Sequence, residues 1–211
     1  MSINHNLYAR LADGFAAAST CIELINGERF TYADLETLSA RAANVLMAQG
    51  LQAGDRVSVM CEKSADLVWL YLGCLRAGLV YHPLNTGYTA KELGFFFADA
   101  GTALVVMDPS FEETVTTALR SGEAEKSAVV TLTLDQHGHG TFAAQAASAA
   151  STFATATNQD NDVAALLYSS GTTGTPKGIP LSHHNLFVNA EALVEAWAFQ
   201  ADDILVHALP L

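Results

Sequence analysis

The segment Ser169–Gly178, SSGTTGTPKG, concentrates the residue types that bind phosphate. Phosphate recognition needs backbone N–H groups that converge on the anion, glycine where those amides must approach closely, and hydroxyl groups with a cation to complete the shell. The glycines would supply the close amides, Lys177 the charge, and Pro176 would stiffen the turn. The segment therefore predicts a phosphate-binding loop, whose binding residues are Ser169, Ser170, Gly171, Thr172, Thr173, Gly174, Thr175 and Lys177.

Two other glycine-rich loops and a plain surface turn are the alternatives. The nucleotide P-loop, G-x-x-x-x-G-K-[ST], does not fit, because counting from Gly171 places Pro176 at the second glycine and Gly178 follows the lysine. The dinucleotide fingerprint does not fit either, because no G-x-G opens the segment. A flexible surface turn would explain glycine and threonine, but not a lysine between proline and glycine at this density.

The composition is typical of a compact α/β protein. Half of the 211 residues are apolar and 15% are charged, against about 25% charged in an average soluble domain. The net charge of −12 argues against a general nucleic-acid or anionic-membrane binder, but a local phosphate site needs only amides and one or two cations. No segment has the roughly 18 apolar residues of a membrane helix, and the first residues show no secretory pattern. The three cysteines lack metal or redox spacing, so free thiols and a cytoplasmic location are expected.

Alternating β and α patterns lead to the loop. Residues 21–32 predict a hairpin that turns at Asn26-Gly27, because both residues tolerate positive φ. Thr31 and Thr89 are predicted helix caps, since each is followed three residues later by an acidic side chain. Strands are predicted over 55–62, 79–83, 103–110 and 127–134, and helices over 31–50, 64–78, 89–98 and 112–119. This alternation predicts a mainly parallel sheet flanked by helices.

A change of composition divides the chain. Residues 1–134 are interpreted as an N-terminal α/β subdomain, and residues 135–162 as a low-complexity surface connection with a short helix near 142–150. Residues 163–211 would start a second subdomain, with the loop, a short strand, a helix from Ser182 to about Trp197, and a strand over 203–211. Because a core strand needs a neighbour and a continuation, we expect this α/β domain to be incomplete.

The loop segment resembles the signature of the adenylate-forming superfamily, which includes acyl-CoA synthetases, firefly-type luciferases and the adenylation domains of peptide synthetases. That signature, [ST]-S-G-[ST]-T-G-x-P-K-G, is matched at every defined position by residues 169–178. The similarity extends over FTYADLETLSARAANVLMAQGLQAGDRVSVMCEKS, SHHNL and HALPL, and is weakest over residues 135–162. PLNTGYTAKEL, DPS and DDILVHALPL are most similar to the malonyl-CoA synthetases.

The resemblance implies a two-step reaction that uses ATP, Mg²⁺ and coenzyme A. A carboxylate attacks the α-phosphate of ATP to give an acyl-adenylate and pyrophosphate, and the thiol of coenzyme A then displaces AMP. Ser169 to Lys177 would contact the β- and γ-phosphates, with Lys177 acting electrostatically. The resemblance places the adenine, ribose, Mg²⁺ and catalytic-lysine contacts beyond Leu211, so no catalytic residue or metal ligand is assigned here and the chain alone is expected to be inactive.

Other readings of the chain stay open. Malonate is the first candidate substrate, and a pocket lined only by apolar residues would favour a medium- or long-chain fatty acid instead. A chain that ends at Leu211 would be a non-catalytic remnant or an ATP-binding or interaction module. Weaker expectations are capping or surface contacts for His183 and His184, packing for His207, and core or interdomain packing for Trp69, Tyr71 and Trp197.

Overall fold

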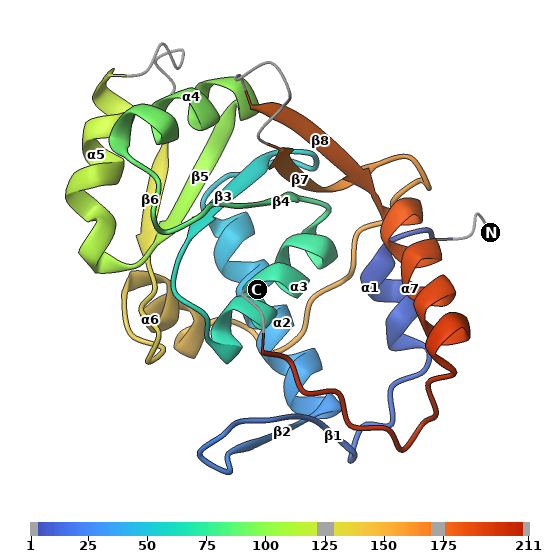
Figure 1. Ribbon diagram of the computed structural model, residues 1–211. Helices are drawn as coiled ribbons and strands as arrows, with labels where there is room; N and C mark the ends of the chain where they lie inside the picture. Colours follow the sequence, from blue (N-terminus) through green and yellow to red (C-terminus); the bar gives the residue numbers. More distant parts are fainter. Residues whose placement is uncertain (1–3, 122–128, 170–175, 209–211) are drawn as a thin grey trace.

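A six-stranded sheet forms the centre of the computed structural model, which describes residues 4–121, 129–169 and 176–208 (Figure 1). The strand order is β6-β5-β3-β4-β7-β8, and the first five strands in that order run parallel, while β8 is antiparallel to β7. The predicted mainly parallel sheet flanked by helices is thereby confirmed. The strands are β3 (Arg56–Met60), β4 (Val80–Pro83), β5 (Thr102–Met107), β6 (Val130–Thr133), β7 (Val163–Ser169) and β8 (Lys177–Ser182).

Helices cover both faces of this sheet (Figure 1). One face packs on α2 (Tyr32–Ala48) and α3 (Ala65–Ala77), and the opposite face on α4 (Ala90–Ala100) and α5 (Glu112–Ser121). Strand residues therefore alternate between two apolar clusters: Val57 and Val59 lie with α2 and α3, whereas Met60 lies with α4 and α5. The remaining elements are α1 (Leu7–Ala12), the hairpin of β1 (Thr20–Glu23) and β2 (Arg29–Thr31), η1 (Pro109–Phe111), α6 (Thr141–Ser148) and α7 (His183–Trp197).

Local capping starts and ends several of the helices. Capping boxes are present at Thr31, Thr89 and Ser182, where the cap hydroxyl accepts the N–H of the third helical residue and that residue's side chain accepts the cap N–H. Gly78 and Gly101 end α3 and α4 with positive φ, a conformation that glycine adopts without a steric penalty. The predicted caps and the helix end at Gly78 are confirmed.

The connection over residues 135–162 lies closer to the core than predicted. Its short helix is confirmed as α6, but Phe142 is only 3% exposed and packs with the α2–α3 cluster. Its carbonyl groups accept hydrogen bonds from the helices beneath: Asn44 donates to Thr152 O (3.0 Å) and Arg76 donates to Phe153 O (2.9 Å). The carbonyl groups of this segment, which is rich in small residues, attach it to the helices. Hydrogen bonds of this kind leave no pattern of large apolar residues in the sequence.

One expectation for the last residues is wrong. The strand predicted from Asp203 does not form over 203–208, where the chain pairs with no strand of the described ranges, and residues 209–211 lie outside those ranges. Trp69 is buried as predicted, whereas Trp197 is 63% exposed and so lies outside the core, which leaves packing between domains as the alternative expected for it. Other apolar side chains on this side of the molecule are exposed as well: Val188, Leu193, Val194, Ile204, Leu205 and Val206.

The crossing of α2 and α3 generates a stability prediction. A Cβ added at Gly73 would lie 2.7 Å from Ala42 Cβ and 2.9 Å from Ala43 N, so the two helices meet backbone to backbone. We expect Gly73→Ala to lower the free energy of unfolding by about 1–3 kcal/mol through overpacking. Gly94→Ala is the matched control, because a Cβ there meets nothing closer than 3.5 Å and alanine favours the helix by up to about 1 kcal/mol. Urea unfolding followed by tryptophan fluorescence would measure both; equal effects of the two substitutions would contradict the prediction.

Candidate functional site

The candidate phosphate-binding loop connects two paired strands. Ser169 ends β7 and Lys177 begins β8, and these two residues are opposite each other in the antiparallel register. Both are exposed, so the structure places a hydroxyl and a cation side by side at the base of the loop. The other predicted binding residues lie outside the described residues: Ser170, Gly171, Thr172, Thr173, Gly174 and Thr175.

The base of this loop lies at the carboxyl edge of the parallel sheet. β7 runs parallel to β4, with Tyr81 opposite Ala165, so Ser169 is at the end where β3, β4 and β5 also terminate. Open α/β sheets bind ligands at this edge, because the loops that leave the strand ends converge there. The position agrees with the phosphate-loop prediction.

Tyr168 supports the loop from the α4 side of the sheet. Its ring centroid lies 4.8 Å from that of Phe96 and 5.3 Å from that of His82, and its hydroxyl donates to Asp99 Oδ2 at 2.6 Å. Burial and the neighbouring carboxylate of Asp99 raise the pKa of Tyr168 above its usual range, so this hydroxyl stays a donor. Composition did not single out Tyr168; its place directly before Ser169 is the only sequence signal.

A buried polar layer lies beneath Tyr168. Ser58 Oγ is hydrogen-bonded to His82 Nδ1 (2.9 Å) and to Thr102 Oγ1 (2.8 Å), which joins β3, β4 and β5 below the carboxyl edge. His82 is fully buried, and desolvation lowers its pKa to about 4. The ring is therefore neutral at pH 7, where its hydrogen bond to Ser58 satisfies one nitrogen.

The paired histidines after the loop have different surroundings. His183 is fully buried, and its Nδ1 accepts the Leu7 N–H at 3.0 Å, which joins α7 to the start of α1. Burial lowers the pKa of His183, in keeping with a neutral acceptor. His184 is half exposed and lies 3.6 Å from Asp160 Oδ1. Of the two roles expected for His183, capping or surface contacts, the structure shows the first, because its ring accepts the first N–H of α1.

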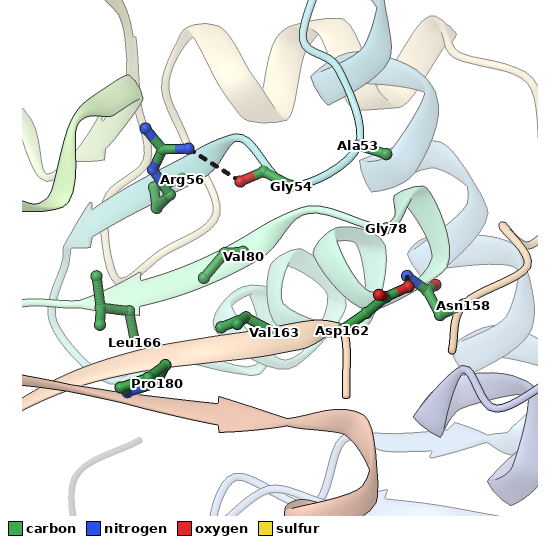
Figure 2. A pocket seen from close by; sticks show the side chains of 10 residues that line it. All are labelled: Ala53, Gly54, Arg56, Gly78, Val80, Asn158, Asp162, Val163, Leu166 and Pro180. Carbon is green, nitrogen blue, oxygen red and sulfur yellow. Dashed lines mark hydrogen bonds between the residues drawn. The ribbon is translucent and has the colours of Figure 1, made fainter. Parts of the chain in front are cut away.

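A pocket of about 540 Å³ opens at the amino ends of the parallel strands and extends to Leu166 and Pro180, in the middle of β7 and β8. Figure 2 shows Arg56, Val80 and Val163, the first residues of three parallel strands, around it. At about 3.3 Å per residue along β7, the nearest lining residue of this strand, Leu166, lies about 10 Å from Ser169, and Val163 lies about 20 Å away. The Arg56 guanidinium donates to the carbonyls of Gly54 (3.1 Å) and Ala100 (2.6 Å), so this cation is already engaged by backbone. Neither Ser169 nor Lys177 lines this pocket.

Within the described ranges, no group of three or more His, Cys, Asp or Glu residues is arranged to hold a metal ion. None of the helices in these ranges combines the length and the hydropathy that a bilayer span requires. His207, expected to pack, accepts instead from Lys63 Nζ through its carbonyl oxygen at 2.8 Å.

The sequence of the chain matches a known enzyme family over most of its length. The family profile of the AMP-binding enzymes matches residues 12–211. The chain belongs to the AMP-binding enzyme family. Its relatives include CoA ligases, among them 4-coumarate–CoA ligase 3 of Oryza sativa, 32% identical over all of this chain and 38% of that protein. The long-chain-fatty-acid–CoA ligase FadD13 of Mycobacterium tuberculosis is 32% identical over 87% of this chain and 35% of its own length.

Solved structures of MatB, a malonyl-CoA synthetase of Rhodopseudomonas palustris, are more similar. Apo MatB superposes with a TM-score of 0.91 at 44% identity over 99% of this chain and 40% of that protein. ATP-bound MatB gives the same TM-score at 45% identity, with 41% of that protein covered. The chain thus spans less than half the length of the relatives it matches.

The neutral state of His82 predicts a pH-dependent stability. The folded protein keeps the ring neutral down to about pH 4, whereas the unfolded chain protonates it near the ordinary histidine pKa of 6.5. Below that value the unfolded state binds more protons, so the free energy of unfolding should fall between pH 6.5 and 4, by up to about 3 kcal/mol from this residue.

Substitution separates this contribution from other titrations. His82→Asn keeps a polar group near the Ser58 hydroxyl but does not titrate, so its stability should change less between pH 7 and 4 than that of the wild type. His137→Asn, at an exposed position, should leave the wild-type slope unchanged. Denaturation curves at several pH values would measure the slopes, and a wild-type slope in His82→Asn would contradict the prediction.

Proposed function

We propose that this chain is part of an ATP-dependent acyl-CoA synthetase and that malonate is its carboxylic acid substrate. The observation that carries the proposal is the pairing of Ser169 with Lys177 at the carboxyl edge of the sheet, within a segment that matches the family signature throughout. The identity of 44–45% to MatB over 99% of the chain supports malonate over other acids.

Lys177 and the hydroxyls of the loop would stabilise the phosphates during adenylation. A free carboxylate is a poor electrophile, so it must first be activated, and negative charge shifts onto the leaving pyrophosphate as the α-phosphate is attacked. A fixed ammonium group and hydroxyls beside the β- and γ-phosphates are the groups that such a transition state requires. Mg²⁺, when bound with ATP, would neutralise phosphate charge. Residues 170–175 would join Ser169 and Lys177 in this contact.

A fatty acid is the second candidate substrate. FadD13, an enzyme named for long-chain fatty acids, is 32% identical over 87% of this chain. The choice between a small dicarboxylate and a fatty acid depends on the lining of the acyl pocket, where a cation would favour malonate and an entirely apolar wall would favour the fatty acid.

The first experiment is to sequence the transcript beyond the codon for Leu211 and to express the complete reading frame. Acid-dependent exchange of pyrophosphate into ATP then reports adenylation alone, and thioester formation with coenzyme A reports the second step. We expect malonate to support exchange far better than palmitate or 4-coumarate. A stop codon directly after Leu211, or exchange that no carboxylic acid stimulates, would overturn the proposal.

Lys177→Ala should lower the rate of pyrophosphate exchange by about 10²–10³, the usual effect of removing one preorganised donor to a developing charge. Lys91→Ala, which removes an exposed lysine from the first turn of α4, is the matched control and should retain the wild-type rate. Initial rates over a range of ATP concentrations would measure both. A loss of less than threefold in Lys177→Ala would contradict a role at the phosphates.

A further inference from the structure

Tyr168 has contacts that phosphate binding does not explain. Successive residues of a strand face opposite sides of the sheet, so Tyr168 lies on the α4 face while its neighbour Ser169 faces the other way. Its ring is surrounded by rings from two other elements, with Phe96 at 4.8 Å, His82 at 5.3 Å and Phe95 at 6.4 Å between centroids. This side chain therefore fixes the end of β7 against α4.

The hydroxyl of Tyr168 donates a hydrogen bond to the carboxylate of Asp99, which lies at the end of α4 where a negative charge is electrostatically unfavourable. Asp99 lies in the last turn of α4, where the helix dipole disfavours negative charge. Tyr168 Oη donates to Asp99 Oδ2 at 2.6 Å across 69 positions of sequence. Hydrogen bonds to a carboxylate are short and stronger than neutral ones, so this bond offsets the unfavourable position of Asp99.

The same ring also reaches across to β8. Tyr168 is opposite Gly178 in the antiparallel register, next to the pair Ser169 and Lys177. A Cβ added at Gly178 would lie 3.5 Å from Tyr168 Cζ and 3.6 Å from Cε1, so the ring covers the bare backbone of this glycine. The side chain of Tyr168 thus links β7, to which it belongs, with α4 and with β8, the strand that begins at Lys177.

We propose that Tyr168 is a positioning residue for ATP. Its hydrogen bond to Asp99 anchors the ring, and the ring holds the paired strand ends at Ser169 and Lys177 in the geometry that adenylation requires. The expected effect of Tyr168 on ATP kinetics rests on the proposed function, whereas its expected effect on the stability of the two strand ends does not. Lys177 is exposed and begins a strand at the edge of the sheet, so its position depends on how firmly β7 and β8 are held. A small displacement of a group that contacts the reacting phosphates costs a large factor in rate.

The test uses one variant that keeps the aromatic ring of residue 168 without its hydroxyl, and one that keeps an oxygen acceptor at residue 99 without its charge. In the protein from the complete reading frame, Tyr168→Phe should lower kcat/KM for ATP in pyrophosphate exchange by about 10- to 100-fold, with little change in KM for the carboxylic acid. Asp99→Ala, at an exposed position, should give the same loss, and the double variant should lose no more than either single one. Asp99→Asn keeps an oxygen that accepts from Tyr168 and should restore nearly wild-type kinetics.

Tyr88→Phe is the matched control, because Tyr88 packs on the same Phe96 ring at 4.8 Å. It should leave kcat/KM for ATP unchanged. Wild-type kinetics in Tyr168→Phe, additive losses in the double variant, or an equal rise in KM for the acid would each overturn the inference. So would a loss in Asp99→Asn as large as that in Asp99→Ala.

Amide hydrogen exchange separates this inference from the proposed function. Peptides that cover 163–169 and 177–182 should exchange faster in Tyr168→Phe than in the wild type or in Tyr88→Phe, whether or not the protein is active. If the wild type adenylates no acid, the proposed function fails while hydrogen exchange still decides whether Tyr168 holds the strand ends. Unchanged exchange in both peptides would overturn the inference.

Discussion

The buried guanidinium of Arg76 is the interaction on which the rest of this structure depends. From the last turn of α3 it donates to Glu36 O (2.7 Å), to Ser39 Oγ (2.9 Å) and to Phe153 O (2.9 Å). It therefore joins α2, α3 and the connection that brings the chain from β6, at one edge of the sheet, back to β7 on the far side of β4. Burying a charge is costly unless its donors are satisfied, and the planar fork of arginine can satisfy several carbonyls at once.

The return of the chain to β7 determines where the candidate loop lies. β7 pairs with β4 and carries β8 beside it, so Ser169 and Lys177 reach the carboxyl edge only because residues 135–162 cross the α2–α3 face. Small residues suit this crossing, because their carbonyl groups come close enough to accept from Asn44 and Arg76. A segment without apolar periodicity thus positions the site through its backbone.

Two layers on the α4 face give the carboxyl edge its rigidity. The lower layer is polar, with Ser58, His82 and Thr102 hydrogen-bonded inside the core, and the upper layer is aromatic, with Tyr168 packed on Phe96. Buried polar groups are tolerated when they bond to one another, and here they join three neighbouring strands. The strand ends at Ser169 and Lys177, between which the proposed phosphate loop runs, therefore belong to a well-packed base.

The sequence by itself determined the features that depend on neighbouring residues, namely helix caps, turns and helix ends. Capping boxes at Thr31 and Thr89, the turn at Asn26-Gly27 and the helix end at Gly78 depend on residues within four positions, and the structure contains each of them. The alternation of strands and helices predicted the parallel sheet, and the signature over residues 169–178 indicated the family to which the chain belongs.

Tertiary structure alone decided the contacts between distant residues. The bond from Tyr168 to Asp99 spans 69 positions, and that from Leu7 to His183 spans 176, so no local pattern announces either one. The strand predicted from Asp203 was wrong for the same reason: an apolar run forms a strand only where a neighbour satisfies its backbone, and residues 203–208 pair with none in the described chain. Short-range hydrogen bonds can be read from spacing, whereas long-range ones depend on which surfaces the fold brings together.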